Sequence, residues 1–153
     1  MSWLSGKKLS DKVKRNASSK VKDAFHGVFP IDELPSFLPH VPIFIIVNTQ
    51  SHNLQGQHWK TIYINAKREG EIFDSLAQPP SELLVRWMNR FTRRWTTNRK
   101  IYQKDTTTTC GAFALYYILQ RLDYPSLDDF THTFSHSLYC NEQIVRSFYK
   151  ELK

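Results

Sequence analysis

The fold of this chain is decided by one apolar stretch, Cys110-Gly111-Ala112-Phe113-Ala114-Leu115-Tyr116-Tyr117-Ile118-Leu119. Apolar residues occur on nearly every side of it, which predicts a buried central helix that starts at Cys110 and runs to about Leu122. The four threonines Thr106 to Thr109 precede it as a loop whose hydroxyls can cap the helix. A helix that is buried all round needs a sheet and further helices around it.

Three strands are predicted upstream of this helix. Ile43 to Thr49 is a continuous β-branched and aromatic run, typical of a strand buried on both faces. Trp59 to Ile64 alternates as a second strand, and Glu71 to Asp74 begins a third. Further helices are predicted from Ser81 to about Trp95, from Ser126 to Ser137 and from Glu142 to Leu152, and a short strand at Ile101-Tyr102. The fold class is therefore α+β, a small mixed sheet packed with helices.

Length and composition indicate one globular domain. The chain has 153 residues, 41% of them hydrophobic and 14% aromatic, so it can bury a core. Residues 1–23 are polar, which predicts a basic N-terminal tail or a marginal helix before an ordered domain at residues 24–153. The apolar runs are too short to cross a membrane and no signal-peptide core is visible, so we expect no membrane partner. Two cysteines exclude a disulfide framework and fit a reducing, intracellular compartment.

Positive charge is concentrated in two stretches. The net charge is +7, and residues 1–23 hold seven Lys or Arg against two Asp, which gives this stretch a charge of +5. A second basic stretch without any acid lies between Glu82 and Asp105, and its members are Arg86, Arg90, Arg93, Arg94, Arg99, Lys100 and Lys104. The first four are predicted to share one face of the helix that begins near Ser81. Both stretches suit a polyanionic partner such as DNA, and a solvated face is the alternative.

Cys110 is the candidate nucleophile. At a helix N-terminus the unpaired N–H groups and the positive end of the dipole favour a thiolate, which predicts a pKa below the ordinary value of about 8.5. Gly111 leaves room for a substrate backbone to approach. The alternative reading of Cys110 is a small buried apolar residue.

His58 and Asp74 are the candidate partners of this thiol. His58 lies where a polar loop meets a strand, and Asp74 ends the strand predicted to lie beside it. An aspartate in this place can orient the imidazole and stabilise its charged form, although a strand-terminal turn aspartate is equally compatible with the pattern. Trp59 is expected to wall the site and exclude water, or to fill the core.

Gln103 precedes Cys110 by seven residues, across a loop. Its amide N–H groups can reach an oxyanion together with the backbone N–H of Cys110. A competing zinc site is suggested by His132, His136 and Cys140, whose i, i+4, i+8 spacing aligns three ligand types on one helix. No fourth ligand is obvious, so no metal is predicted.

The order of these blocks resembles a known family. The blocks are Ile46-Val47-Asn48-Thr49, Gly56-Gln57-His58-Trp59, Phe73-Asp74-Ser75, Gln103, and Cys110-Gly111-Ala112-Phe113. Together they resemble the adenain-type cysteine proteases of adenoviruses, Polinton (Maverick) elements and virophages. The same order of His, acid, Gln and Cys also marks the distant proteases that process ubiquitin-like modifiers. The resemblance covers roughly residues 25 to 120.

The resemblance implies a thiol protease that cleaves viral capsid or core precursor proteins during virion maturation. Carried over by position, His58 is the base, Asp74 the orienting acid, Cys110 the nucleophile and Gln103 the oxyanion donor. It further implies DNA as an activator, no cofactor needed for the chemistry itself, a monomer, and a location in the virion and at the intracellular site of virus assembly. Adenain is activated by a peptide bound through a disulfide. No cysteine occurs here between Asp74 and Cys110, so an activating peptide would lack that anchor.

Two other functions stay open. An isopeptidase acting on ubiquitin-like modifiers would use the same four residues. A non-catalytic, basic nucleic-acid-binding virion protein would have no need to keep all four.

Overall fold

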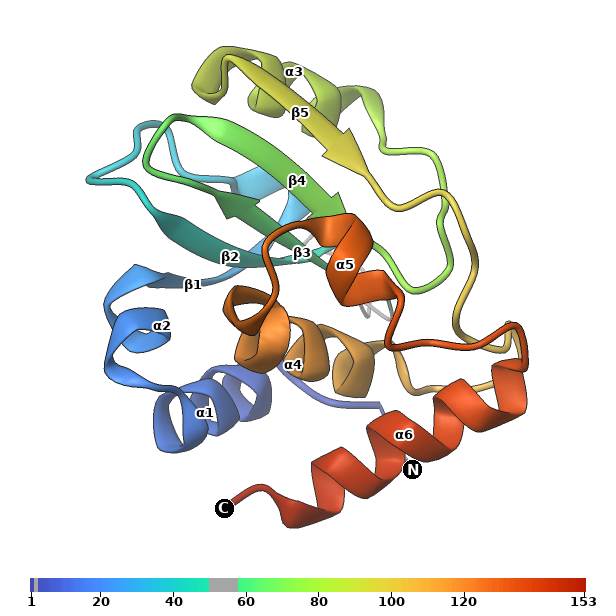
Figure 1. The fold of residues 1–153 in the computed structure, drawn as a ribbon. Coiled ribbons are helices and arrows are strands. Elements are labelled where there is room, and N and C mark those ends of the chain that lie inside the picture. The colour runs from blue at the N-terminus through green and yellow to red at the C-terminus, as the bar shows by residue number, and fades with distance from the viewer. Residues whose placement is uncertain (2, 50–57) are drawn as a thin grey trace.

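A five-stranded mixed sheet forms the middle of the molecule in the computed structural model, which describes residues 1, 3–49 and 58–153 (Figure 1). The strands lie in the order in which they occur along the chain. They are β1 (Phe25–Pro30), β2 (Ile43–Asn48), β3 (Trp59–Ile64), β4 (Glu69–Phe73) and β5 (Arg94–Thr97). The pairs β1/β2 and β4/β5 are parallel, and the pairs β2/β3 and β3/β4 are antiparallel. The predicted α+β class is confirmed.

Helices cover both faces of this sheet. The helix α4 (Cys110–Gln120) lies on one face and α3 (Glu82–Phe91) on the other, as Figure 1 shows. Side chains of β2 alternate between the two cores: Phe44 and Ile46 join the cluster that contains α4, whereas Ile43, Ile45 and Val47 join the cluster that contains α3. The strand buried on both faces and the central helix were therefore predicted correctly.

The first 23 residues follow the helical alternative of the prediction and not the tail. They form α1 (Gly6–Asn16) and α2 (Ser19–Ala24), with Ser5 and Ser18 as N-caps. Leu9 and Val13 of α1 are completely buried in the cluster that contains α4. Their spacing of four residues places both on one helix face, and burying that face stabilises a helix whose remaining residues are polar.

The second basic stretch also differs from the prediction. The helix α3 ends at Phe91 rather than near Trp95, and Arg94–Thr97 forms β5, which pairs with β4. The four arginines therefore do not share a helix face: Arg86 and Arg90 lie on α3, Arg93 in the connection, and Arg94 on the strand. The β-branched residues of β5 favour the edge of the sheet over another helical turn. No strand forms at 101–102.

The C-terminal helices begin and end at other residues than predicted. They are α5 (Leu127–Thr131) and α6 (Leu138–Glu151), and Ser137 caps the second. Short 3₁₀ turns occur at Ile31–Glu33 and Arg121–Asp123.

The zinc hypothesis required three ligands on one helix. His132 instead lies at the end of α5, His136 in the connection, and Cys140 in the first turn of α6. Within the described residues, no group of three His, Cys, Asp or Glu side chains could hold a metal ion. The same part of the chain contains no helix that is long and apolar enough to span a membrane.

Candidate active site

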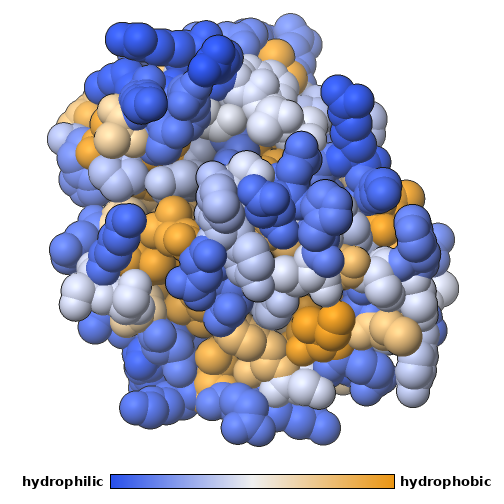
Figure 2. Space-filling model, viewed as in Figure 1, coloured by the Kyte–Doolittle hydropathy of each residue, from blue (hydrophilic) through white to orange (hydrophobic). Residues whose placement is uncertain are grey.

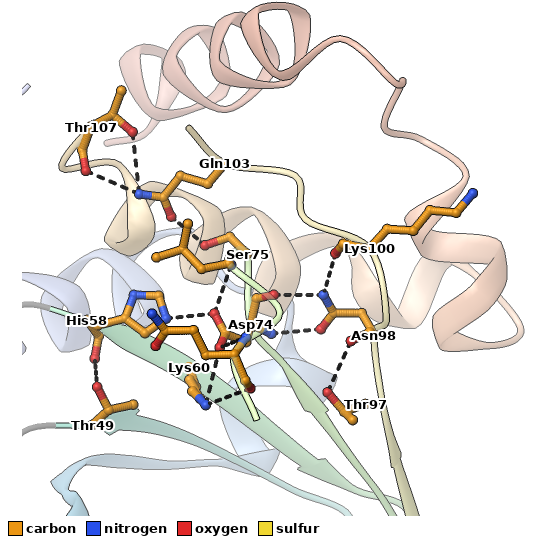
Figure 3. Close-up of polar contacts among 12 residues, drawn as sticks. Thr49, His58, Lys60, Asp74, Ser75, Thr97, Asn98, Lys100, Gln103 and Thr107 are labelled. Carbon is orange, nitrogen blue, oxygen red and sulfur yellow. Dashed lines mark hydrogen bonds and ion pairs between the residues drawn. The ribbon is translucent and has the colours of Figure 1, made fainter. Parts of the chain in front are cut away.

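His58 and Asp74 lie side by side at one end of the sheet, where β3 begins and the neighbouring β4 ends. His58 immediately precedes β3 and Asp74 immediately follows β4, and the antiparallel register sets Thr61 opposite Phe73. The Nε2 atom of His58 lies 2.6 Å from Oδ1 of Asp74 (Figure 3). Both residues are buried, Asp74 completely. The structure thus brings together the predicted base and the predicted orienting acid.

The carboxylate of Asp74 is held by more partners than the sequence indicated. Lys60 Nζ lies 3.2 Å from Oδ2, and the backbone N–H groups of Leu76 and Gln78 donate to the two oxygens at 2.9 and 3.0 Å. Burial by itself raises the pKa of Asp74. The hydrogen bond and charge of His58, the charge of Lys60 and the Leu76 N–H together outweigh burial and lower the pKa below its ordinary value.

The backbone of Asp74 is fixed by Asn98, which follows β5. The backbone N–H of Asp74 donates to Asn98 Oδ1 at 2.8 Å, and Asn98 Nδ2 donates to the carbonyl of Asp74 at 2.7 Å. Figure 3 shows this paired contact on the side of Asp74 that faces away from His58. Asn98 therefore holds the acid in register with the histidine.

Cys110 is the first residue of α4, and its side chain is buried with 1% exposure. Burial raises the pKa of the Cys110 thiol to about 11, although hydrogen bonds from the backbone N–H groups of Trp59 and Gly111 act in the opposite direction. The expected lowering of this pKa at the helix N-terminus is therefore wrong for the resting protein, because loss of hydration outweighs the N–H groups. The bond from Trp59, the residue after His58, places the thiol beside the base.

Gln103 is buried beside the same strand ends. Its Oε1 accepts a hydrogen bond from Ser75 Oγ at 2.5 Å, and its Nε2 donates to the carbonyl and hydroxyl of Thr107 at 3.3 and 3.4 Å (Figure 3). Ser75 also accepts the backbone N–H of Gln103 at 3.1 Å. Because Ser75 follows Asp74, these hydrogen bonds fix the position of Gln103 relative to the acid. The carbonyl of Thr107 can only accept a hydrogen bond, so the N–H end of the amide faces Thr107.

Glu142 of α6 organises the loop that joins Gln103 to Cys110. Its carboxylate accepts hydrogen bonds from Thr109 Oγ1 at 2.8 Å, from Thr107 Oγ1 at 3.0 Å and from the backbone N–H of Lys104 at 3.1 Å. Glu142 is only 3% exposed. The predicted threonine cap is not made, since Thr109 occupies the N-cap position without a side-chain hydrogen bond to the helix.

Sequence reasoning missed four residues of this site: Lys60, Ser75, Asn98 and Glu142. The sequence offers a signal for two of them. Lys60 is the one charged residue of the strand that follows the histidine, and Ser75 is adjacent to the acid. Asn98 and Glu142 are distant in sequence, and nothing in the local pattern marks them.

Trp59 and Gly111, the predicted substrate-binding residues, both contact the beginning of the chain. Trp59 is 5% exposed, and its Nε1 donates to the carbonyl of Leu4 at 3.0 Å. Gly111 faces the Leu4 side chain. Both positions therefore lie at the nucleophile, and Leu4 lies against each of them.

The predicted DNA-binding residues lie mostly on the surface. Arg86, Arg90, Arg93, Arg94, Arg99 and Lys100 are exposed, and Lys104 is half-buried with its Nζ 5.2 Å from the ring centre of Tyr139. Figure 2 shows a largely hydrophilic surface at the top of the view, over α3 and β5. Two of the arginines are paired with acids, Arg86 with Glu82 and Arg94 with Glu69.

Comparison with known proteins gives a consistent result. A family model described as the Ulp1 protease family, C-terminal catalytic domain, matches residues 7–153. An African swine fever virus protein described as a SUMO-1 cysteine protease is 28% identical over 100 residues, which cover 58% of this chain and 37% of the relative. The chain thus spans little more than a third of the length of the curated relatives that it matches.

Solved structures share the fold. The crystal structure of an African swine fever virus protease aligns with a TM-score of 0.61 at 19% identity, covering 80% of this chain and 58% of that one. The central domain of an uncharacterized Legionella pneumophila protein aligns with a TM-score of 0.54 at 13% identity, covering 99% and 96%. At these identities the likeness concerns the fold alone.

Proposed function

Because the chain belongs to the Ulp1 protease family, and is accordingly a cysteine protease as the sequence predicted, we propose that it is an endopeptidase. Its proposed substrates are viral capsid or core precursor proteins. The observation that carries the proposal is the buried pair of His58 and Asp74, 2.6 Å apart, beside the thiol of Cys110. The sulfur accepts a hydrogen bond from the backbone N–H of Trp59, the residue after His58. Similarity to proteins of African swine fever virus supports a viral setting. We place the chain near the adenain-type enzymes on the motif order, with virion maturation at the assembly site as its role.

The proposed reaction begins with Cys110. Its sulfur attacks the scissile carbonyl carbon while its proton passes to Nδ1 of His58, because Nε2 is held by Asp74. The carbonyl oxygen becomes an oxyanion that accepts hydrogen bonds from the Cys110 backbone N–H and from Gln103 Nε2. The present bonds of this Nε2 to Thr107 are long, so it can turn to a stronger acceptor.

The second half of the reaction restores the enzyme. His58 gives its proton to the leaving amine nitrogen, and the C–N bond breaks to leave a thioester on Cys110. A water molecule then attacks the thioester while His58 takes its proton. The C–S bond breaks, the proton returns to the sulfur, and the carboxylic acid product leaves.

The proposal is tested with capsid and core precursors encoded by the same genome. We expect incubation with the full chain to give new peptide termini, which mass spectrometry identifies, and expect none with the Cys110→Ala variant. Intact precursors with both proteins would contradict a maturation role.

An isopeptidase is the second candidate, favoured by the family and by the description of a viral relative as a SUMO-1 cysteine protease. Release of ubiquitin-like modifiers from conjugates, with no cleavage of the precursors, would replace the first proposal by this one.

We further propose that the exposed basic residues bind DNA without sequence preference. Such binding weakens steeply as salt rises, because phosphate contacts release counterions. We expect the double substitution Arg90→Glu and Arg99→Glu to weaken binding to any duplex in a filter or anisotropy assay. The same charge reversal at Lys8 and Lys14 on α1 tests whether the N-terminal basic stretch makes the contact instead. Binding that does not depend on salt would contradict the proposal.

A further inference from the structure

Met1 and Leu4, which precede α1, lie against the start of α4, where the candidate nucleophile is. The carbonyl of Leu4 accepts the hydrogen bond from Trp59 Nε1 at 3.0 Å, and the Leu4 side chain is 5% exposed within the same apolar cluster as Cys110. The carbonyl of Met1 accepts a hydrogen bond from Thr108 Oγ1, two residues before the nucleophile. Figure 1 shows this segment passing from α1 along α4.

Leu4 fills the space that the absence of a side chain at Gly111 creates. A Cβ atom at position 111 would lie 3.0 Å from Leu4 Cδ1 and 3.1 Å from Leu4 Cβ, closer than nearly all such contacts in proteins. Gly111 was predicted from the sequence to make room for a substrate backbone. In the structure the chain itself takes that room, with an apolar side chain inserted and a main-chain carbonyl hydrogen-bonded, which is how an extended peptide binds in a cleft.

This segment is held at both ends, by the hydrogen bond of the Met1 carbonyl to Thr108 at one end and by α1 at the other. Ser5 caps α1 by accepting the N–H of Lys8 at 3.1 Å, and α1 is anchored by its buried Leu9 and Val13. The tether keeps Leu4 at a high effective concentration next to Gly111, so a peptide in solution has to compete with an intramolecular group. Cys110 is correspondingly shielded, whereas Cys140 is exposed.

A cavity beside the segment shows where such a peptide could continue. Its volume is about 350 Å³, and it is lined by residues of α1 and β1, by Asn48 and by Trp59. Trp59 thus borders an open cavity and also donates its Nε1 hydrogen to Leu4.

We propose that Met1 and residues 3–5 form an intramolecular occupant of the substrate cleft, which must leave before a peptide reaches Cys110, and that Leu4 marks a subsite for an apolar substrate side chain. This regulation rests on the proposed protease function. It makes the chain latent until a competing segment of substrate or a partner displaces Leu4.

The test is alkylation of Cys110 by iodoacetamide in the full chain, read by mass spectrometry with Cys140 as the internal reference. Leu4→Asp puts a carboxylate into the apolar contact, and we expect it to raise the rate at Cys110 about 10-fold, the size of a modest population shift. Leu83→Asp, the same substitution at an exposed leucine of α3, is the matched control and should leave the rate unchanged. A synthetic peptide of residues 1–5, added to the Leu4→Asp variant, should protect Cys110 again.

A second variant guards against misfolding of the first. Thr108→Val removes the hydrogen bond to Met1 and keeps the side-chain shape, so we expect a rise of about threefold with an unchanged circular dichroism spectrum. An unchanged rate at Cys110 in folded Leu4→Asp, or in Thr108→Val if Leu4→Asp does not fold, would overturn the occupant. Faster alkylation without hydrolysis of any precursor would keep the occupant and overturn the proposed cleavage of viral precursors instead.

Discussion

Asp74 and Cys110 are both almost fully buried, yet burial has opposite outcomes at the two residues. The pKa of Asp74 is lowered, because a histidine, a lysine and backbone N–H groups bind its carboxylate. The pKa of Cys110 is raised to about 11, because burial of the sulfur and the nearby charge of Asp74 outweigh the hydrogen bonds from backbone N–H groups. The number of charged partners, and not the depth, therefore decides whether a buried group stays ionised.

This difference divides the work within the site. The acid is prepared in advance, with its charge already compensated. The nucleophile is a neutral thiol in the resting protein, so its proton has to leave as the attack proceeds. Anything that covers Cys110, Leu4 included, favours the neutral thiol.

The largest effect on catalysis is expected when the buried thiol of Cys110 is deleted. Cys110→Ala deletes the nucleophile and should lower kcat for peptide hydrolysis by about 10⁴-fold or more, since loss of one member disables such a unit. Cys140→Ala, at an exposed cysteine, should have no effect. Hydrolysis that survives Cys110→Ala would assign the chemistry to another residue.

The second largest effect is expected when the charged carboxylate of Asp74 is replaced by a neutral amide. Asp74→Asn keeps the shape of the side chain but presents the wrong hydrogen-bonding groups to His58, so we expect kcat to fall about 10²- to 10⁴-fold. Asp105→Asn on the surface is the matched control. A change confined to KM would show that Asp74 does not orient the base.

The third largest effect is expected from loss of the oxyanion donor Gln103. Gln103→Glu keeps the shape and loses the amide N–H groups, and we expect kcat to fall about 10²-fold with little change in KM. Gln143→Glu, which is exposed, adds the same charge elsewhere. An increase in KM alone would make Gln103 a substrate-binding residue.

A smaller effect is expected from the residue that positions the loop. Glu142→Gln weakens the bonds to Thr107, Thr109 and the Lys104 N–H, so we expect kcat to fall about 10-fold and unfolding to become easier by about 1–3 kcal/mol. Glu151→Gln is the exposed control. Lower stability with unchanged kcat would limit Glu142 to a structural role.

The smallest expected effect is on acid stability. The pKa of Asp74 is lower in the folded chain than in the unfolded chain, so its charge stabilises the fold above about pH 4 and this contribution is lost as the pH falls through the folded value. Thermal melts should therefore show a shallower acid decline for Asp74→Asn than for the unaltered chain. Parallel curves would contradict the assigned direction.

Local pattern in the sequence determined several parts of this protein. The β-branched and aromatic residues at 43–49 and 59–64 predicted β2 and β3, and the long apolar run from Cys110 predicted a helix buried on nearly every side, α4. His58 and Asp74 were predicted beside each other because two consecutive strands joined by a tight turn pair antiparallel. These inferences need only neighbours along the chain.

The tertiary structure decided what depends on contacts between distant residues. Leu4 meets Trp59 across 55 positions, Asn98 meets Asp74 across 24, and Glu142 meets Thr109 across 33. No local period encodes such pairs, so the packing of α1, the edge strand β5 and the loop anchor were missed. The ionisation of Cys110 belongs here too. A helix start predicts a lowered pKa, but only the packed structure reveals how much water is lost from around the sulfur.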